Sequence, residues 1–168
     1  KYRLVGSEMC IRDSLYINKG FALENLENTD PKLIKEMRDS YFDQIQSYKK
    51  NKNKNIIIDK MPLNLVHVGE ILRFFPNAKF ILALRHPYDC VLSCFMQNFM
   101  LNHAMANFLN LDDTLKLYDL TMSLWKKYTN VFKIDHHLIR YEDVVSNFKK
   151  TIGAVSYTHL RAHETVLH

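Results

Sequence analysis

Residues 79–87 read Lys-Phe-Ile-Leu-Ala-Leu-Arg-His-Pro (KFILALRHP), and they hold the strongest indication of the fold. The apolar run over Lys79–Leu84 predicts a buried strand. Pro87 is well placed in the first turn of a helix that we expect to continue to about Phe99. Arg85 therefore lies between a strand and a helix, a position where backbone N–H groups favour anions.

Two further strands are predicted, one on each side of this stretch. The β-branched run Ile56–Ile58 leads into Asp59-Lys60 and indicates a buried strand. Alternating residues over His137–Tyr141 predict the other strand. The polar, basic segment Lys49–Asn55 is typical of a solvated loop.

Helical patterns separate the strands. Asp30 as N-cap and Pro31 at the first helical position begin a helix of about four turns. Further helices are predicted over Leu63–Phe75, Leu111–Tyr128 and Glu142–Ile152. In the longest of them Asn110 can act as cap, and the apolar stripe predicted to be core is Leu111, Leu115, Tyr118, Met122 and Trp125. This alternation predicts an α/β fold with a parallel sheet flanked by helices.

Composition excludes several classes of protein. The chain has 168 residues, of which 47% are hydrophobic and 24% charged, as in an ordinary globular domain. No apolar stretch approaches the roughly 18 residues of a membrane span. A net charge of +5, from 23 basic and 18 acidic residues, is too small to predict nucleic-acid binding but suits an anionic ligand. Three cysteines without paired CxxC spacing favour a reducing compartment, and we expect a cytoplasmic protein.

The two ends differ from the rest of the chain. Residues 1–14 contain SEMCIRDS and residues 154–168 contain VSYTHLRAHET, and both resemble peptides translated from sequencing-adapter DNA. We therefore expect these ends to be non-native and the protein domain to occupy residues 15–153. The alternative is a pair of native tails, the second being a histidine-rich segment that binds metal.

The ends of the predicted strands define a candidate site. Ligands of parallel sheets bind beyond the carboxyl ends of the strands. Lys60, Arg85 and Tyr141 lie at these three ends, as expected for one pocket that holds an anion and a ring. Arg85 offers a fork of donors that matches phosphate oxygens, and Ser93 adds a hydroxyl in the next helix. His86, Cys90 and Cys94 share a helical face, and we interpret them as pocket lining, with no metal expected.

Two stretches carry a resemblance to a known family. DKMPLNLVHVGEILRFFPNAKFILALRHPYDCVLSCF at residues 59–95 and IRYEDVV at residues 139–145 resemble the PAPS-dependent sulfotransferases. The tyrosylprotein-like and bacterial repeat-associated branches are the most similar. The resemblance covers residues 56–152 and implies a P-loop nucleotide-hydrolase-like fold. It also implies transfer of a sulfuryl group from PAPS to an acceptor hydroxyl on a peptide, carbohydrate or small molecule, with PAP as the product.

The resemblance assigns roles to four residues. An Arg at a strand end and a Ser eight positions later hold the 3′-phosphate in this family, and Arg85 and Ser93 match them. Lys60 matches the lysine that assists the transferring sulfuryl group. Tyr141 matches the aromatic residue near the adenine.

Part of the family pattern is missing. The glycine-containing loop that cradles the 5′-phosphosulfate lies upstream of all matched residues, so we expect an incomplete domain that is inactive by itself. Pro62 occupies the position of the catalytic His of the cytosolic branch, so no general base can be named. The alternatives are a P-loop kinase with an upstream GxxxxGK[ST] loop and a non-catalytic nucleotide-binding or interaction fragment. Met96–Asn110 is a candidate lining of the acceptor entrance.

Overall fold

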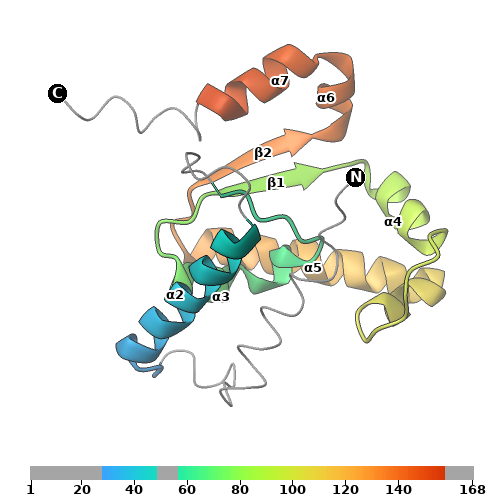
Figure 1. Cartoon of the computed structure of the whole chain (residues 1–168). Helices are drawn as coiled ribbons and strands as arrows, with labels where there is room; N and C mark the ends of the chain where they lie inside the picture. The colour runs from blue at the N-terminus through green and yellow to red at the C-terminus, as the bar shows by residue number, and fades with distance from the viewer. Residues whose placement is uncertain (1–27, 49–56, 158–168) are drawn as a thin grey trace. The chain divides into compact units, whose positions relative to one another are not determined.

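The computed structural model describes residues 28–48 and 57–157 (Figure 1). The loop predicted over Lys49–Asn55, residues 1–14 and residues 158–168 lie outside the described residues. The chain divides into two compact units, Lys1–Ala78 and Lys79–His168. In the described ranges, no helix has the length and apolar character needed to cross a membrane.

The first unit begins with the helix α2, Pro31–Tyr48. The Asp30 side chain accepts a hydrogen bond of 2.9 Å from the Lys32 N–H, which confirms the predicted N-cap. Ile34 and Met37 are buried at the helical spacing that the sequence predicted.

Two shorter helices follow in this unit, the 3₁₀ helix η2, Asn64–His67, and α3, Val68–Phe74. They confirm the helix predicted over Leu63–Phe75, whose first turn is the tighter 3₁₀ form. The Arg38 Nε donates a hydrogen bond of 2.7 Å to the Phe74 carbonyl, so α2 is linked to the last residue of α3. The Phe75 ring packs between the Tyr41 and Phe42 rings at centroid distances of 5.1 and 5.6 Å.

The strand predicted over Ile56–Ile58 is wrong in the part that the structure describes. Ile57 and Ile58 have no strand conformation, and their side chains are 37% and 72% exposed. A short apolar run becomes a buried strand only when a neighbouring strand supplies hydrogen bonds and a layer covers its face. Neither is provided for these isoleucines within residues 57–157.

The second unit contains a parallel two-stranded sheet formed by β1, Phe80–Leu84, and β2, His136–Arg140. Both arrows point the same way in Figure 1, and the register places Leu84 opposite Arg140. The sheet therefore confirms two of the predicted strands and their parallel pairing, which requires a crossover such as the helical connection between them.

The crossover between the strands contains three helices. They are α4, Pro87–Phe95, the 3₁₀ helix η3, Met105–Leu109, and α5, Leu111–Val131. The helix α4 ends four residues before the predicted Phe99. Asn110 caps α5 by accepting a hydrogen bond of 2.8 Å from the Asp112 N–H, as the sequence predicted.

The buried face of α5 differs from the predicted apolar stripe. Leu111 and Leu115 are each 43% exposed, whereas Thr114 and Thr121 are buried beside Trp125. Each threonine hydroxyl donates to a backbone carbonyl within hydrogen-bond distance, which removes the penalty of burying it. The helix is therefore rotated so that its small polar residues join Trp125 in the core.

The chain after β2 forms two helices where one was predicted over Glu142–Ile152. They are α6, Tyr141–Ser146, and α7, Phe148–Val155. Asn147 separates them because its backbone leaves the helical region, at φ −148° and ψ 72°, and its side chain accepts a hydrogen bond from the Lys150 N–H. Asparagine favours such caps because its amide competes with the helical backbone hydrogen bonds.

Candidate functional site

The candidate site lies at the carboxyl edge of the β1–β2 sheet. Because Leu84 pairs with Arg140, the two strands end at the same level, and the next residues, Arg85 and Tyr141, emerge side by side. In Figure 1 β1 leads into α4 and β2 into α6 at this edge. Two helices of the second unit thus begin where a parallel sheet usually binds its ligand.

Arg85 and Tyr141 are in direct contact. The guanidinium carbon of Arg85 is 5.2 Å from the centroid of the Tyr141 ring, which is the geometry of a cation–π interaction. The Arg85 Nε lies 3.9 Å from the Asp89 carboxylate, one helical turn further on. Among the described residues, no hydrogen bond engages the terminal nitrogens of Arg85. A positioned, half-exposed guanidinium therefore has donors available beside a flat ring.

The two strand-to-helix turns are joined by Glu142. Its carboxylate accepts a hydrogen bond of 2.8 Å from the backbone N–H of His86. Hydrogen bonds from its own backbone N–H and from His86 lower the pKa of Glu142, because they favour the ionised carboxylate. The contact links the residue after Arg85 to the residue after Tyr141. The sequence motif contained Glu142, but its role could be recognised only once the two turns were side by side.

Ser93 lies further along α4, in its seventh residue, and is half-buried. Its neighbour Cys94 has a pKa raised by burial and by the charge and hydrogen bonding of Cys90. The Tyr118 hydroxyl of α5 also has a raised pKa, mainly because of burial and secondly because of Cys90. Both shifts favour the neutral forms of these two side chains. Within residues 28–48 and 57–157, no three metal-ligating side chains gather.

Lys60 belongs to the first unit, whereas the carboxyl edge of the two strands belongs to the second unit. It is exposed, in a segment of irregular backbone at residues 57–61. Its neighbour Asp59 accepts a hydrogen bond of 2.9 Å from the Tyr41 hydroxyl, which ties this segment to α2. The prediction that Lys60 follows a strand is therefore wrong, since the isoleucines before it form none in the described part.

A histidine–carboxylate pair in the first unit was not predicted from the sequence. The Nδ1 of His67 is 2.9 Å from Oε1 of Glu70, and the two side chains are 24% and 12% exposed. The spacing of three residues at a helix start was the available signal. The pair joins the last residue of η2 to the first turn of α3.

Known proteins and protein families share parts of this sequence. The chain is 37% identical over 79 residues to an "Uncharacterized protein" of Aquifex aeolicus (strain VF5). That match covers 47% of this chain but 10% of the relative, so the chain spans only a small part of that relative's length. No solved structure matches the chain. A family model described as "Sulfotransferase family" matches residues 7–160. With its mixed helices and small parallel sheet, the chain therefore belongs to the sulfotransferase family, whose general chemistry is the transfer of a sulfuryl group.

Proposed function

We propose that this chain is the 3′-phosphate-binding part of a sulfotransferase that uses PAPS as donor and releases PAP. The observation that carries the proposal is the contact between Arg85 and Tyr141 at the carboxyl edge of the parallel sheet. Membership of the sulfotransferase family supports it from the sequence side. The acceptor is a hydroxyl group, and the nucleotide is the second partner.

The chemistry of the edge fits the nucleoside end of PAPS. Arg85 would donate its fork of N–H groups to the 3′-phosphate, the arrangement that suits a guanidinium and a dianion. Tyr141 would offer its ring face to the adenine, since flat rings stack on aromatic side chains. Ser93 is the proposed hydroxyl donor to the same phosphate, eight residues after Arg85.

Lys60 is the proposed residue of the chemical step. In sulfuryl transfer the acceptor oxygen forms a bond to sulfur while the bond from sulfur to the bridging phosphate oxygen breaks. Negative charge then develops on the departing PAP, and an ammonium group at that oxygen lowers the barrier. The acceptor proton goes to a general base that the matched residues do not contain.

The proposal assigns the activity to a complete enzyme. We infer an incomplete P-loop nucleotide-hydrolase-like domain over residues 15–153, with adapter-derived residues at 1–14 and 154–168. The helix α7 extends two residues past Gly153, and its Val155 is 6% exposed. This chain by itself should bind PAP without turning over PAPS, because none of its four glycines belongs to a loop like the 5′-phosphosulfate loop of the family. The cytoplasmic location stays a prediction.

Calorimetry with PAP and AMP tests the 3′-phosphate site, because these nucleotides differ only by that phosphate. We expect PAP to bind the chain more tightly than AMP. Arg85→Ala should weaken PAP binding about 10- to 100-fold, the loss of one or two charge-assisted hydrogen bonds, and leave AMP binding nearly unchanged.

Two variants control this measurement. Arg85→Lys keeps the charge without the fork and should lie between wild type and Arg85→Ala. Lys126→Ala removes an equal charge from an exposed position on α5 and should change PAP affinity less than twofold. Equal affinity of the wild-type chain for PAP and AMP would contradict the proposal, and so would an unchanged preference in Arg85→Ala.

A further inference from the structure

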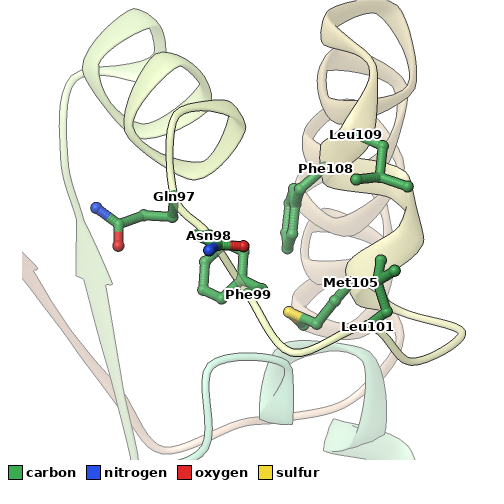
Figure 2. A pocket seen from close by; sticks show the side chains of 7 residues that line it. All are labelled: Gln97, Asn98, Phe99, Leu101, Met105, Phe108 and Leu109. Carbon is green, nitrogen blue, oxygen red and sulfur yellow. The ribbon is translucent and has the colours of Figure 1, made fainter.

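A second concave feature lies at the other end of α4. A pocket of about 300 Å³ opens between the turn that ends α4 and the helix η3 (Figure 2). Its volume is at the lower end of the roughly 300–1,000 Å³ range of small-ligand pockets. The residues that line it are Gln97, Asn98, Phe99, Leu101, Met105, Phe108 and Leu109. It falls inside the segment Met96–Asn110, which sequence composition had indicated as an acceptor entrance.

The lining defines the chemistry of the ligand. None of the lining side chains is charged, so the pocket offers no partner to an ionised group. The Phe99 and Phe108 rings lie 5.1 Å apart with an interplanar angle of 40°, and Figure 2 shows the Met105 thioether beside them. Aromatic faces and a methionine sulfur favour a flat aromatic ring. Asn98 supplies an amide group that can hydrogen-bond a neutral hydroxyl, whereas Figure 2 shows the Gln97 amide pointing away from the rings.

Hydrogen bonds made by residues next to the pocket hold its η3 wall in place. Asn102 accepts from the Met105 N–H at 2.8 Å, and the Asn107 side chain donates to the Ala104 carbonyl at 2.9 Å. The buried Thr114 hydroxyl donates to the Asn107 carbonyl at 3.1 Å, which fastens η3 to α5. Such support reduces the ordering cost that a ligand must otherwise overcome. The side chains of Leu101 and Leu109, 69% and 68% exposed, lie at the solvent side of the pocket.

The pocket and the nucleotide edge share the helix α4. Arg85 precedes its first residue and Gln97 follows its last, so they are separated along the helix axis by about 13 Å, from nine residues at about 1.5 Å each. Ser93, the other residue proposed to bind the 3′-phosphate, lies four residues before Gln97, so the two proposed sites are neighbours along one helix.

We propose that this pocket binds the ring of a neutral, small aromatic alcohol, and that this alcohol is the acceptor of the sulfuryl group. The acceptor role rests on the proposed sulfotransferase function. The uncharged lining argues against an anionic acceptor, and the apolar rings argue against a carbohydrate, whose hydroxyl groups would lose hydrogen bonds to water.

The test uses the 168-residue chain labelled with ¹³C at the methionine methyl groups and titrated with 2-naphthol. We expect saturable shifts of the Met105 methyl signal, assigned through Met105→Leu. The carboxylate 2-naphthoate should bind at least tenfold more weakly, because the pocket has no charged partner for it. Naphthalene, which lacks the hydroxyl, should shift the same signal with lower affinity, because the Asn98 amide then has no partner on the ligand.

Variants separate the pocket from the rest of the surface. Phe108→Ala should weaken 2-naphthol binding about tenfold through loss of a ring contact, and Phe108→Leu should recover part of it. Leu120→Ala removes an exposed apolar side chain from α5, outside the pocket, and should leave the affinity unchanged. Failure of wild type to bind 2-naphthol at millimolar concentration overturns the proposal, as does equal binding by wild type and Phe108→Ala.

PAP calorimetry on the same samples distinguishes the two proposals. If both 2-naphthol and PAP bind, and Phe108→Ala loses only 2-naphthol, the pocket and its acceptor role are both supported. If 2-naphthol binds and PAP does not, the pocket stands and the acceptor role fails with the sulfotransferase proposal. If PAP binds and 2-naphthol does not, the nucleotide site stands and the pocket proposal is wrong.

Discussion

The carboxyl edge of the β1–β2 sheet and the segment around Lys60 look alike in sequence but differ in structure. In both, a basic residue follows an apolar run, directly at Leu84-Arg85 and after one aspartate at Ile58-Asp59-Lys60. At the sheet edge the run is a paired strand, and a hydrogen bond from His86 to Glu142 fixes the turn that follows. Around Lys60 the backbone is irregular, and a hydrogen bond from the Tyr41 hydroxyl to Asp59 links this segment to α2.

Strand pairing determines which of the two basic residues starts from a fixed backbone position. Arg85 emerges from a strand whose last residue is held opposite Arg140, so its starting point is set by backbone hydrogen bonds. Lys60 starts from residues without such bonds in the described part of the chain. A side chain that is already positioned binds a phosphate more tightly, because less conformational entropy is lost on binding. This comparison supports the proposed binding role of Arg85, whereas the proposed role of Lys60 in the reaction rests on the family resemblance.

Replacing Lys60 should have the largest effect. In the complete enzyme, Lys60→Ala should lower kcat about 100-fold, since the ammonium group stabilises charge that develops only in the transition state. PAP affinity should change less than threefold, the reverse of the pattern expected for Arg85→Ala. Steady-state kinetics and PAP calorimetry on the same preparations measure both quantities.

A matched control for Lys60 is Lys35→Ala, which removes an equal charge from an exposed position on α2 in the same unit. We expect it to leave kcat unchanged. If Lys60→Ala keeps wild-type turnover, Lys60 takes no part in the chemical step. The proposed assignment of binding to Arg85 and reaction to Lys60 would then be wrong.

Two truncations compare the packing of the two regions. Val91 of α4 is 4% exposed, so Val91→Ala should lower the free energy of unfolding by about 2 kcal/mol. Ile58 is 72% exposed, so Ile58→Ala should change it by less than about 0.5 kcal/mol. Urea unfolding followed by circular dichroism measures both. A loss of 2 kcal/mol or more in Ile58→Ala would show that Ile58 is buried, as the sequence pattern predicted.

The pH dependence of Glu142 should give the smallest effect. Its folded-state pKa is lowered by the N–H groups of Glu142 and His86, so the contact stabilises the fold above the ordinary pKa of a glutamate. That stabilisation is lost as the pH falls through the lowered folded-state pKa. A ¹³C NMR titration of the side-chain carboxyl should place the midpoint below 4.5, its ordinary value.

Glu142→Gln provides the control for this titration, because it keeps an acceptor oxygen and removes the titrating group. In this variant the free energy of unfolding should depend less on pH in the acidic range. A carboxyl midpoint at or above the ordinary value would contradict the His86 contact as the structure describes it.

Much of the second unit could be predicted from the sequence. The apolar run of β1, the Asn110 cap of α5 and the parallel arrangement followed from local patterns, because burial and capping leave regular traces in sequence. The same patterns failed at Ile57 and Ile58, where no partner strand is described, and at Asn147, whose side chain interrupts a helix that propensity alone would continue. They also misplaced the buried face of α5, since a threonine can be buried when its hydroxyl is hydrogen-bonded.

The sequence by itself determined that Arg85 lies between a strand and a helix and that the chain resembles sulfotransferases. Only the tertiary structure placed the Tyr141 ring against the Arg85 guanidinium, the Glu142 carboxylate on the His86 N–H, and a pocket between α4 and η3. The physical reason is sequence distance. Local patterns report bonds between residues a few positions apart, whereas His86 and Glu142 are 56 positions apart and meet only because two parallel strands end at the same level.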